Sequence, residues 1–315
     1  MNPPRSPSVV QRSDVGQRRL VNEDSFGRRE PSDAMSRARG CLYVVADGMG
    51  GHAAGDVASQ MAVETVLDEY YAIPDWQDPA QGLRLAIERA NEAIYVRASE
   101  EPLLREMGTT IVAAVLLGDQ ATLANVGDSR GYLLRDDRLQ QLTRDHSWVA
   151  KAVEDGVLTP EQAREHPDRN IIYRSLGAGP TVEVQISELP LAPGDRLLLC
   201  SDGLTDGLSD GEIAALAAGS DLDAAAELLI GAANDRGGAD NITVTLVALE
   251  GPARRPRAER DTPRRVETLR TQAVQVAPGN RDDRATRPRV QITPEDDEAV
   301  ADNKRWWQRR RKDSA

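Results

Sequence analysis

Short apolar runs rich in β-branched residues recur through the first 250 residues, and most are bounded by Gly, Asp or Pro. This pattern predicts β-strands. The expected strands are CLYVVA (41–46), TTIVAAVLL (109–117), QATLANV (120–126), RGYLLRD (130–136), TVEVQIS (181–187), DRLLLCS (195–201) and NITVTLVAL (241–249). The close spacing of the runs between 109 and 136, with a turn signal at LLGDQAT, predicts consecutive antiparallel strands.

Longer segments between these runs carry apolar residues at helical spacing and predict helices over 56–71, 79–98 and 221–234. The expected core-facing stripes are Val57, Met61, Thr65 and Leu67 in the first segment, and Leu83, Ile87, Ala90 and Ile94 in the second. Long helices beside mainly antiparallel strands predict a layered domain of the α+β class.

The chain has 315 residues and 40% apolar residues, enough for a sizeable core. Residues 1–250 contain 22 Lys and Arg against 40 Asp and Glu, whereas residues 251–315 contain 17 against 11. The overall net charge of −12 disfavours binding to a nucleic-acid phosphate backbone, so no nucleic-acid partner is expected.

The two ends of the chain differ in amino-acid composition from residues 9–250. Residues 251–315 are rich in Pro and charge and poor in apolar residues, which predicts a disordered basic tail, and residues 1–8, MNPPRSPS, are predicted to be a disordered N-terminus. The tail ends in KRWWQRRRK (304–312), which could make a weak contact with an anionic membrane surface, although a solvated end is the simpler interpretation.

Only two cysteines occur, Cys41 and Cys200, each in a strand-like run, which is typical of buried thiols in a reducing compartment. The first residues do not resemble a signal peptide, and no segment approaches the roughly 20 apolar residues of a membrane span. We therefore expect a cytoplasmic protein, and a monomer.

Acidic residues stand at the ends of several apolar runs, where an unpaired carboxylate is costly. Asp47 ends one strand-like run and is followed by glycines, Asp202 ends another, and Asp240 precedes the last. Asp128 lies between two runs, and Glu23 and Asp24 precede the first. Each Asp-Gly alone is a common turn, but the repetition predicts strand ends that converge and present oxygen ligands to cations.

The ligand types favour Mg²⁺ or Mn²⁺, because hard divalent cations prefer oxygen. The three histidines and two cysteines show no zinc-binding spacing. Asp47 could bridge two ions, and Gly48 lacks a side chain that would keep its carbonyl away from a metal or its water. A phosphate-binding loop is the alternative for this stretch, disfavoured by the carboxylate and by the absence of GK[ST].

Seven motifs appear in order: RLVNEDS, VVADGMGGHAAGDVAS, GTTIVAAVL, NVGDSRGYLL, LTRDHS, LLLCSDGLTD and GGADNITVTLVAL. As a set, over residues 9–250, they resemble the metal-dependent serine/threonine protein phosphatases of type 2C, the PPM family, in its bacterial form. The resemblance implies a four-layer α-β-β-α sandwich of two mainly antiparallel sheets flanked by helices, with metals at one end.

The resemblance also implies roles for individual residues. Asp47 would bridge two metal ions that activate the nucleophilic water, and Gly48 would be a ligand through its carbonyl. Asp202 and Asp240 would hold the first ion, and Glu23, with Asp24 beside it, would belong to the shell of the second. Asp128 with Asp202 would form a third metal site. Arg19 would clamp the substrate phosphate, for which its planar guanidinium is suited.

Two features of the resemblance stay open. Eukaryotic relatives often place His after the Asp-Gly, whereas this chain has Met49, so the leaving-group acid is unassigned. His52 is a candidate, and the alternative is a structural histidine. Residues 145–178 resemble a variable flap beside the active site, and a plain helical insertion explains them equally well.

The function expected from the resemblance is hydrolysis of phosphoserine and phosphothreonine in proteins, with a serine/threonine kinase among the partners. Two other classes remain: a phosphatase-fold regulator dedicated to one signalling partner, and a metal-binding module without turnover. The complete acidic set disfavours the second of these, and no sensor domain supports the first.

Overall fold

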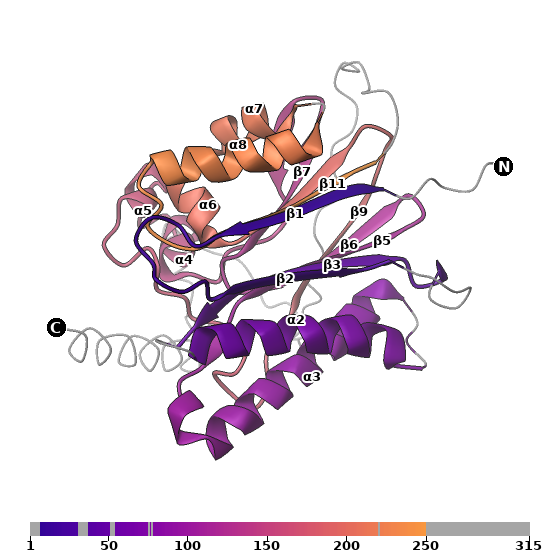
Figure 1. The fold of residues 1–315 in the computed structure, drawn as a ribbon, viewed down its shortest axis with the longest axis vertical. Helices are drawn as coiled ribbons and strands as arrows, with labels where there is room; N and C mark the ends of the chain where they lie inside the picture. The colour runs from indigo at the N-terminus through magenta and orange to yellow at the C-terminus, as the bar shows by residue number, and fades with distance from the viewer. Residues whose placement is uncertain are drawn as a thin grey trace, which may run out of the picture. The chain divides into compact units, whose positions relative to one another are not determined.

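The computed structural model describes residues 7–30, 37–50, 54–74, 76, 78–219 and 221–249. Two antiparallel sheets face each other and helices cover both outer faces, an α-β-β-α arrangement that confirms the predicted α+β class (Figure 1). The strands begin with Ser8 and end with Ala248. The basic tail and the KRWWQRRRK cluster lie outside the described residues, as do residues 1–6.

The first sheet has the order β1-β11-β10-β7-β8. Its strands are β1 (Ser8–Asp14), β7 (Arg130–Arg135), β8 (Arg138–Gln141), β10 (Arg196–Cys200) and β11 (Ile242–Ala248). Helices α6 (Asp202–Gly207), α7 (Asp210–Ala217) and α8 (Leu222–Asp235) lie on its outer side (Figure 1). Leu198, Val244 and Leu246 pack against these helices.

The second sheet has the order β2-β3-β5-β6-β9, and the short β4 also pairs with β3. Its strands are β2 (Asp24–Arg29), β3 (Cys41–Met49), β4 (Gly108–Thr109), β5 (Ile111–Leu117), β6 (Gln120–Val126) and β9 (Gln185–Pro190). Helices α2 (Ala54–Ala72) and α3 (Pro79–Glu100) cover it, and the 3₁₀ turn η1 (Pro102–Leu104) follows (Figure 1).

The face between the two sheets follows from strand alternation, because successive side chains point to opposite sides. In β3, Leu42, Val44 and Ala46 face the helices, whereas Tyr43 and Val45 face the other sheet. In β10, Leu197 and Leu199 belong to the same inter-sheet core. Asp47 follows Val45 by two positions and therefore continues the inter-sheet face beyond the apolar core.

Several predicted elements are corrected by the structure. β5 and β6 pair as expected, but β7 lies in the other sheet, between β10 and β8, so the three runs between 109 and 136 do not form one meander. The strand expected over 181–187 begins at Gln185. β1, β2 and β8 are strands that the apolar pattern misses, because all three form sheet edges with polar residues and β8 is only RLQQ.

The first predicted helix is present, but its buried stripe is wrong. α2 buries Ala58, Ala62, Val66 and Tyr70, whereas Val57, Met61 and Leu67 are partly buried at the margin. Small residues let the helix approach the sheet closely, so the largest apolar residues do not mark the buried face. The stripe predicted for α3 is confirmed, since Leu83, Ile87, Ala90 and Ile94 are all buried.

Residues 145–178 form an irregular segment with two short helices, α4 (Trp148–Glu154) and α5 (Pro160–Arg164). We call it the flap segment. Both cysteines are free thiols, and Cys41 is half-buried rather than buried as predicted. None of the helices in the described ranges is long and apolar enough to cross a membrane.

Candidate metal centre

Strand pairing brings the first two acidic residues together at one end of the sandwich. β2 and β3 are antiparallel with Asp24 opposite Asp47, so both side chains lie on the inter-sheet face. Ser201 and Thr243 donate hydroxyl hydrogen bonds to Asp24 Oδ2 over 2.8 and 2.7 Å. Asp24 thereby joins the ends of β10 and β11 in one sheet to β2 in the other.

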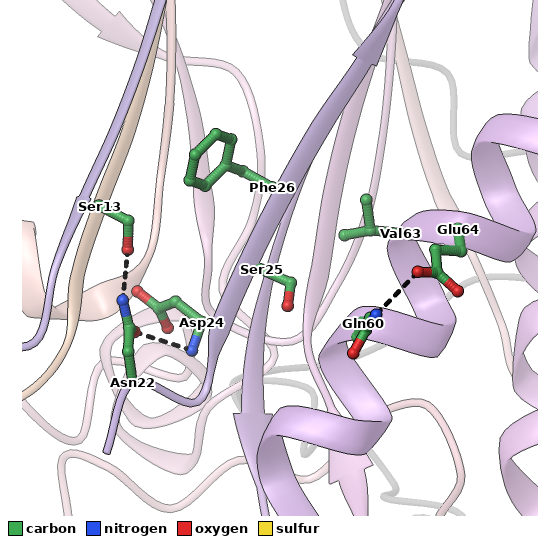
Figure 2. A pocket seen from close by; sticks show the side chains of 8 residues that line it. All are labelled: Ser13, Asn22, Asp24, Ser25, Phe26, Gln60, Val63 and Glu64. Atoms are coloured by element: carbon green, nitrogen blue, oxygen red, sulfur yellow. Dashed lines mark hydrogen bonds between the residues drawn. The ribbon is translucent and has the colours of Figure 1, made fainter. Parts of the chain in front are cut away.

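A cavity of about 340 Å³ opens beside Asp24, at the edge of the sandwich where β1, β2 and α2 meet. Figure 2 shows Ser13, Asn22 and Asp24 on one side of it and Gln60, Val63 and Glu64 of α2 on the other. Asn22 donates to Ser13 Oγ (2.8 Å) and accepts from the Asp24 N–H (3.1 Å). The Asn22 amide therefore fixes the backbone at the start of β2.

Asp47 and Gly48 end β3 against backbone on both sides. The carbonyl of Asp47 accepts from the N–H of Thr110 (2.9 Å), and the Thr110 hydroxyl accepts from the N–H of Asp47 (3.1 Å). Gly48 donates its N–H to the Glu23 carbonyl, and a Cβ at Gly48 would lie 2.1 Å from the carbonyl oxygen of Gly55. Steric exclusion by backbone therefore explains why glycine follows Asp47.

Asp128 and Asp202 approach the same end from the other side. Asp128 lies in the tight turn from β6 to β7, and Asp202 opens α6 directly after β10. Asp206, one turn further along α6, contacts Arg169 of the flap segment at 3.4 Å. Asp206 lies within LLLCSDGLTD, but the sequence assigns it no role, because nothing separates it from an ordinary helix carboxylate.

Asp240 lies in the loop before β11 and is paired with Arg19 at 2.6 Å, while Glu23 lies 3.7 Å from the same guanidinium. Asn241 holds this arrangement together. It is buried, donates to the carbonyls of Val15 (2.9 Å) and Val21 (3.0 Å), and accepts from the Glu23 N–H (2.8 Å). Asn241 thus fastens the turn that carries Arg19 to the Asp240 loop, a role that sequence reasoning missed.

The carboxylates of this group interact electrostatically with one another. Burial first, and then the charges of Asp24, Asp202, Asp240 and Asp128, raise the pKa of Asp47 well above its ordinary value. Burial and the carboxylates of Asp128, Asp240 and Asp206 raise the pKa of Asp202 in the same way. Burial also raises the pKa of Asp24 and of Asp128 to about 7. Carboxylates this close together favour protonation unless positive charge is supplied.

Arg19 supplies part of that charge. Burial opposes its ionisation, but the carboxylates of Asp240, Glu23 and Asp47 outweigh burial and raise the pKa of the guanidinium. Its side chain is 46% exposed, so one side of the guanidinium remains open to solvent. Arg19 is therefore at the rim of the cluster rather than inside it.

The donor set fits hard divalent cations. Asp24 Oδ1 and Asp202 Oδ1 are buried oxygens with no hydrogen-bond partner among the described residues, and every acidic side chain of the cluster offers oxygen. Over the described ranges, no three His, Cys, Asp or Glu side chains already form a metal cage. Arg19 is paired with Asp240, and the hydroxyls of Ser201 and Thr243 bind Asp24.

The structure thus brings Glu23, Asp24, Asp47, Gly48, Asp128, Asp202 and Asp240 to one end of the sandwich, with Arg19 at the rim. The metal-ligand roles predicted for them stay predictions. His52, the candidate leaving-group acid, lies outside the described residues, so its role stays a prediction.

The sequence profile described as protein phosphatase 2C matches residues 16–237 of the chain. The chain belongs to the protein phosphatase 2C family. This family membership confirms the resemblance to type 2C phosphatases that the ordered motifs indicated.

Relatives of this type 2C chain include the serine/threonine phosphatase Stp of Listeria innocua, 43% identical over 240 residues that cover 75% of this chain and 93% of the relative. A solved serine/threonine phosphatase of S. agalactiae is 39% identical with a TM-score of 0.71, covering 78% of this chain and all of that one. The catalytic domain of the phosphatase PstP, solved with two manganese ions, is 37% identical with a TM-score of 0.68, covering 78% and 99%.

Proposed function

We propose that this type 2C phosphatase hydrolyses phosphoserine and phosphothreonine in proteins and that the reaction requires Mn²⁺ or Mg²⁺. The observation that carries the proposal is the convergence of carboxylates around Asp47 at one end of the sandwich. The relatives named as serine/threonine phosphatases, and the related PstP domain with its two manganese ions, support it.

The residues proposed to hold the ions are those that converge there. Asp47 would bridge two ions, and the carbonyl of Gly48 would be a ligand. Asp202 and Asp240 would hold the first ion, and Glu23 with Asp24 would belong to the shell of the second. Asp128 with Asp202 would hold a third. Two divalent ions that share a carboxylate supply an activated water and stabilise the charge of a transferring phosphoryl group.

Arg19 is proposed to bind the substrate phosphate. Its guanidinium is exposed at the rim and is now held by Asp240. If a bound cation neutralised the charge of Asp240, the planar guanidinium of Arg19 would become available to two phosphate oxygens. Asn241 keeps the Arg19 turn in register with Asp240, so the phosphate would be presented to the carboxylate cluster in a fixed position. The partners would be phosphorylated proteins, a serine/threonine kinase among them.

The proposal is tested with the full chain on a phosphothreonine peptide and a phosphotyrosine peptide of the same sequence. After treatment with EDTA we expect no turnover, and after addition of Mn²⁺ or Mg²⁺ we expect hydrolysis of the phosphothreonine peptide. Full turnover by rigorously metal-free protein would refute metal dependence. Preference for the phosphotyrosine peptide would refute the proposed substrate class.

A further inference from the structure

His146 stands at the start of the flap segment and is 3% exposed, although the proposed chemistry gives it no role. Its backbone N–H donates to the carbonyl of Gly127 over 2.9 Å. Its ring Nδ1 accepts from the N–H of Gly127 over 3.0 Å. His146 and Gly127 therefore hold each other by two reciprocal hydrogen bonds, and Gly127 is the residue directly before Asp128.

The same residue also holds the returning arm of the flap segment. The carbonyl of His146 accepts from the N–H of Tyr173 over 2.9 Å, and its ring packs edge-on against the Tyr173 ring at 5.8 Å. Ser147 forms an isolated β-bridge with Ile172. One residue thus connects both arms of the flap segment to the turn that carries Asp128.

The ring of His146 has one specific hydrogen-bonding task. Because Nδ1 accepts a peptide N–H, the proton of the neutral imidazole is assigned to Nε2. Nε2 lies 3.1 Å from an Arg174 nitrogen, and two donors facing each other do not form a hydrogen bond. The Gly127 N–H is buried and fixed by the backbone, whereas the other terminal nitrogen of Arg174 has a separate acceptor in Glu183. The one acceptor of the neutral ring, Nδ1, therefore binds the N–H of Gly127.

The Gly127 turn is in turn connected to Asp47. Gly127 has φ +103°, and a Cβ there would lie 2.6 Å from the Thr110 methyl carbon, so the turn is packed onto Thr110. Ser129 and Thr110 share a hydroxyl hydrogen bond of 2.7 Å, and Thr110 binds the backbone of Asp47. Hydrogen bonds, joined by the backbone from Gly127 to Ser129, thus connect the flap segment past Asp128 to Asp47.

We propose that His146 is a positioning residue through which the flap segment and the Asp128 carboxylate hold each other in place. A substrate that orders the flap segment then also fixes Asp128, and a cation at Asp128 steadies the flap segment, since coupling of binding is reciprocal. This functional consequence rests on the proposed metal role of Asp128, whereas the mechanical link does not.

The mechanical link is tested by hydrogen exchange of the full chain in EDTA. His146→Leu removes the acceptor, and we expect faster exchange in the flap segment and at the Gly127 amide, with the β5 and β11 amides unchanged. His146→Asn places an amide oxygen near the position of Nδ1, and we expect it to restore the protection of Gly127. If the leucine variant does not fold, His146→Gln replaces it, because the longer side chain carries its amide past the position of Nδ1. Exchange at the Gly127 amide is then compared among wild type, His146→Asn and His146→Gln.

His166 is the matched control, because it lies in the same segment and its Nδ1 accepts only a local N–H, that of Asp168, at 3.1 Å. His166→Leu should loosen the flap segment without affecting Gly127. Unchanged exchange at Gly127 in His146→Leu would overturn the proposal. The same loss at Gly127 in His146→Asn as in His146→Leu would also overturn it, because the acceptor would then not matter.

The functional consequence is tested by Mn²⁺ titration calorimetry. We expect His146→Leu to weaken the weakest Mn²⁺ step by about tenfold, within the usual range of coupling between linked sites. In an Asp128→Asn background the same change should have no further effect. An equal loss in both backgrounds would overturn coupling through Asp128. If Asp128→Asn alone leaves Mn²⁺ binding unaltered, the proposed metal role of Asp128 fails, and exchange at Gly127 still decides the mechanical link.

Discussion

The inter-sheet space has an apolar interior and a carboxylate end, and the same strands build both. Within the interior, Tyr43, Val45 and Leu199 are fully buried. Two residues beyond Val45 the same face carries Asp47, where burial first, and then repulsion by the neighbouring carboxylates, raise the pKa of its carboxyl. The apolar interior therefore stabilises the fold, whereas the buried carboxylates at the end lower its stability. The free energy from the interior must offset that cost.

Stability and activity therefore depend on different positions along the same strands. Neutralising a carboxylate at the end should stabilise the metal-free protein and abolish function, whereas no change in the interior should do both. The following experiments test this separation, in decreasing order of expected effect.

The largest effect is expected for Asp47→Asn, which removes the charge at the centre of the cluster. Turnover of a phosphothreonine peptide with Mn²⁺ should fall by more than the roughly 10- to 100-fold typical of mutating a residue that only hydrogen-bonds to a metal ligand. In EDTA its melting temperature should rise by roughly 2–8 °C, as about 1–2 kcal/mol gives in a domain of this size. Near-normal turnover would show that Asp47 has been misassigned.

The second effect concerns pH in the metal-free protein. Asp24 and Asp128 have a folded pKa of about 7, above the ordinary value of 3.8. The folded state therefore keeps protons that the unfolded state has lost, so stability falls as pH rises from about 4 to above 7. Thermal melts in EDTA should show a lower melting temperature at pH 8 than at pH 5.5, by several degrees.

Two comparisons check the origin of this slope. Burial lowers the pKa of His146 to about 3, which acts in the opposite sense below pH 6.5, but it is one group against several carboxyls. Asp128→Asn should flatten the slope, and Mn²⁺ should restore stability at pH 8. A metal-free protein that is more stable at pH 8 would contradict the repulsion described for the carboxylate end.

A smaller effect is expected at the rim. Arg19→Ala should mainly raise KM for phosphopeptides, with some loss of kcat if the clamp tightens during reaction, and should leave Mn²⁺ affinity nearly unchanged. Arg12→Ala is the matched control, because Arg12 is equally exposed at 46% and also pairs with an aspartate, Asp223. A large loss of Mn²⁺ binding by calorimetry would place Arg19 in a structural role instead.

The smallest effect is expected from removing residues 251–315. A chain of residues 1–250 should melt at the same temperature and hydrolyse small phosphopeptides as the full chain does, because the apolar pattern ends with β11. A difference is expected only with a large protein substrate or anionic vesicles, where the basic Trp-Trp cluster would add local concentration. A truncated chain that unfolds would mean that the tail contributes to the core.

The sequence predicted the fold class and the converging acidic residues because both leave local signals. Apolar runs mark β3, β5, β6, β10 and β11, and Asp-Gly marks two strand ends. Edge strands such as β2, with the sequence DSFGRR, leave no such signal because only one side is paired. The partner of β7 and the roles of Asn241 and Asp206 depend on long-range packing, which no local pattern encodes.

The contact between Gly48 and Gly55 also limits how this chain can change over generations. A Cβ at Gly48 would meet the Gly55 carbonyl, and a Cβ at Gly55 would lie 2.6 Å from Glu23 Oε1 and 3.0 Å from the Gly48 carbonyl carbon. A bulky residue in a core can be accommodated when a neighbouring side chain shrinks, but most of the atoms facing these glycines are backbone. The three nearest atoms facing Gly48 are all backbone, so no second substitution makes room for a side chain there, whereas Gly55 also faces the side chain of Glu23.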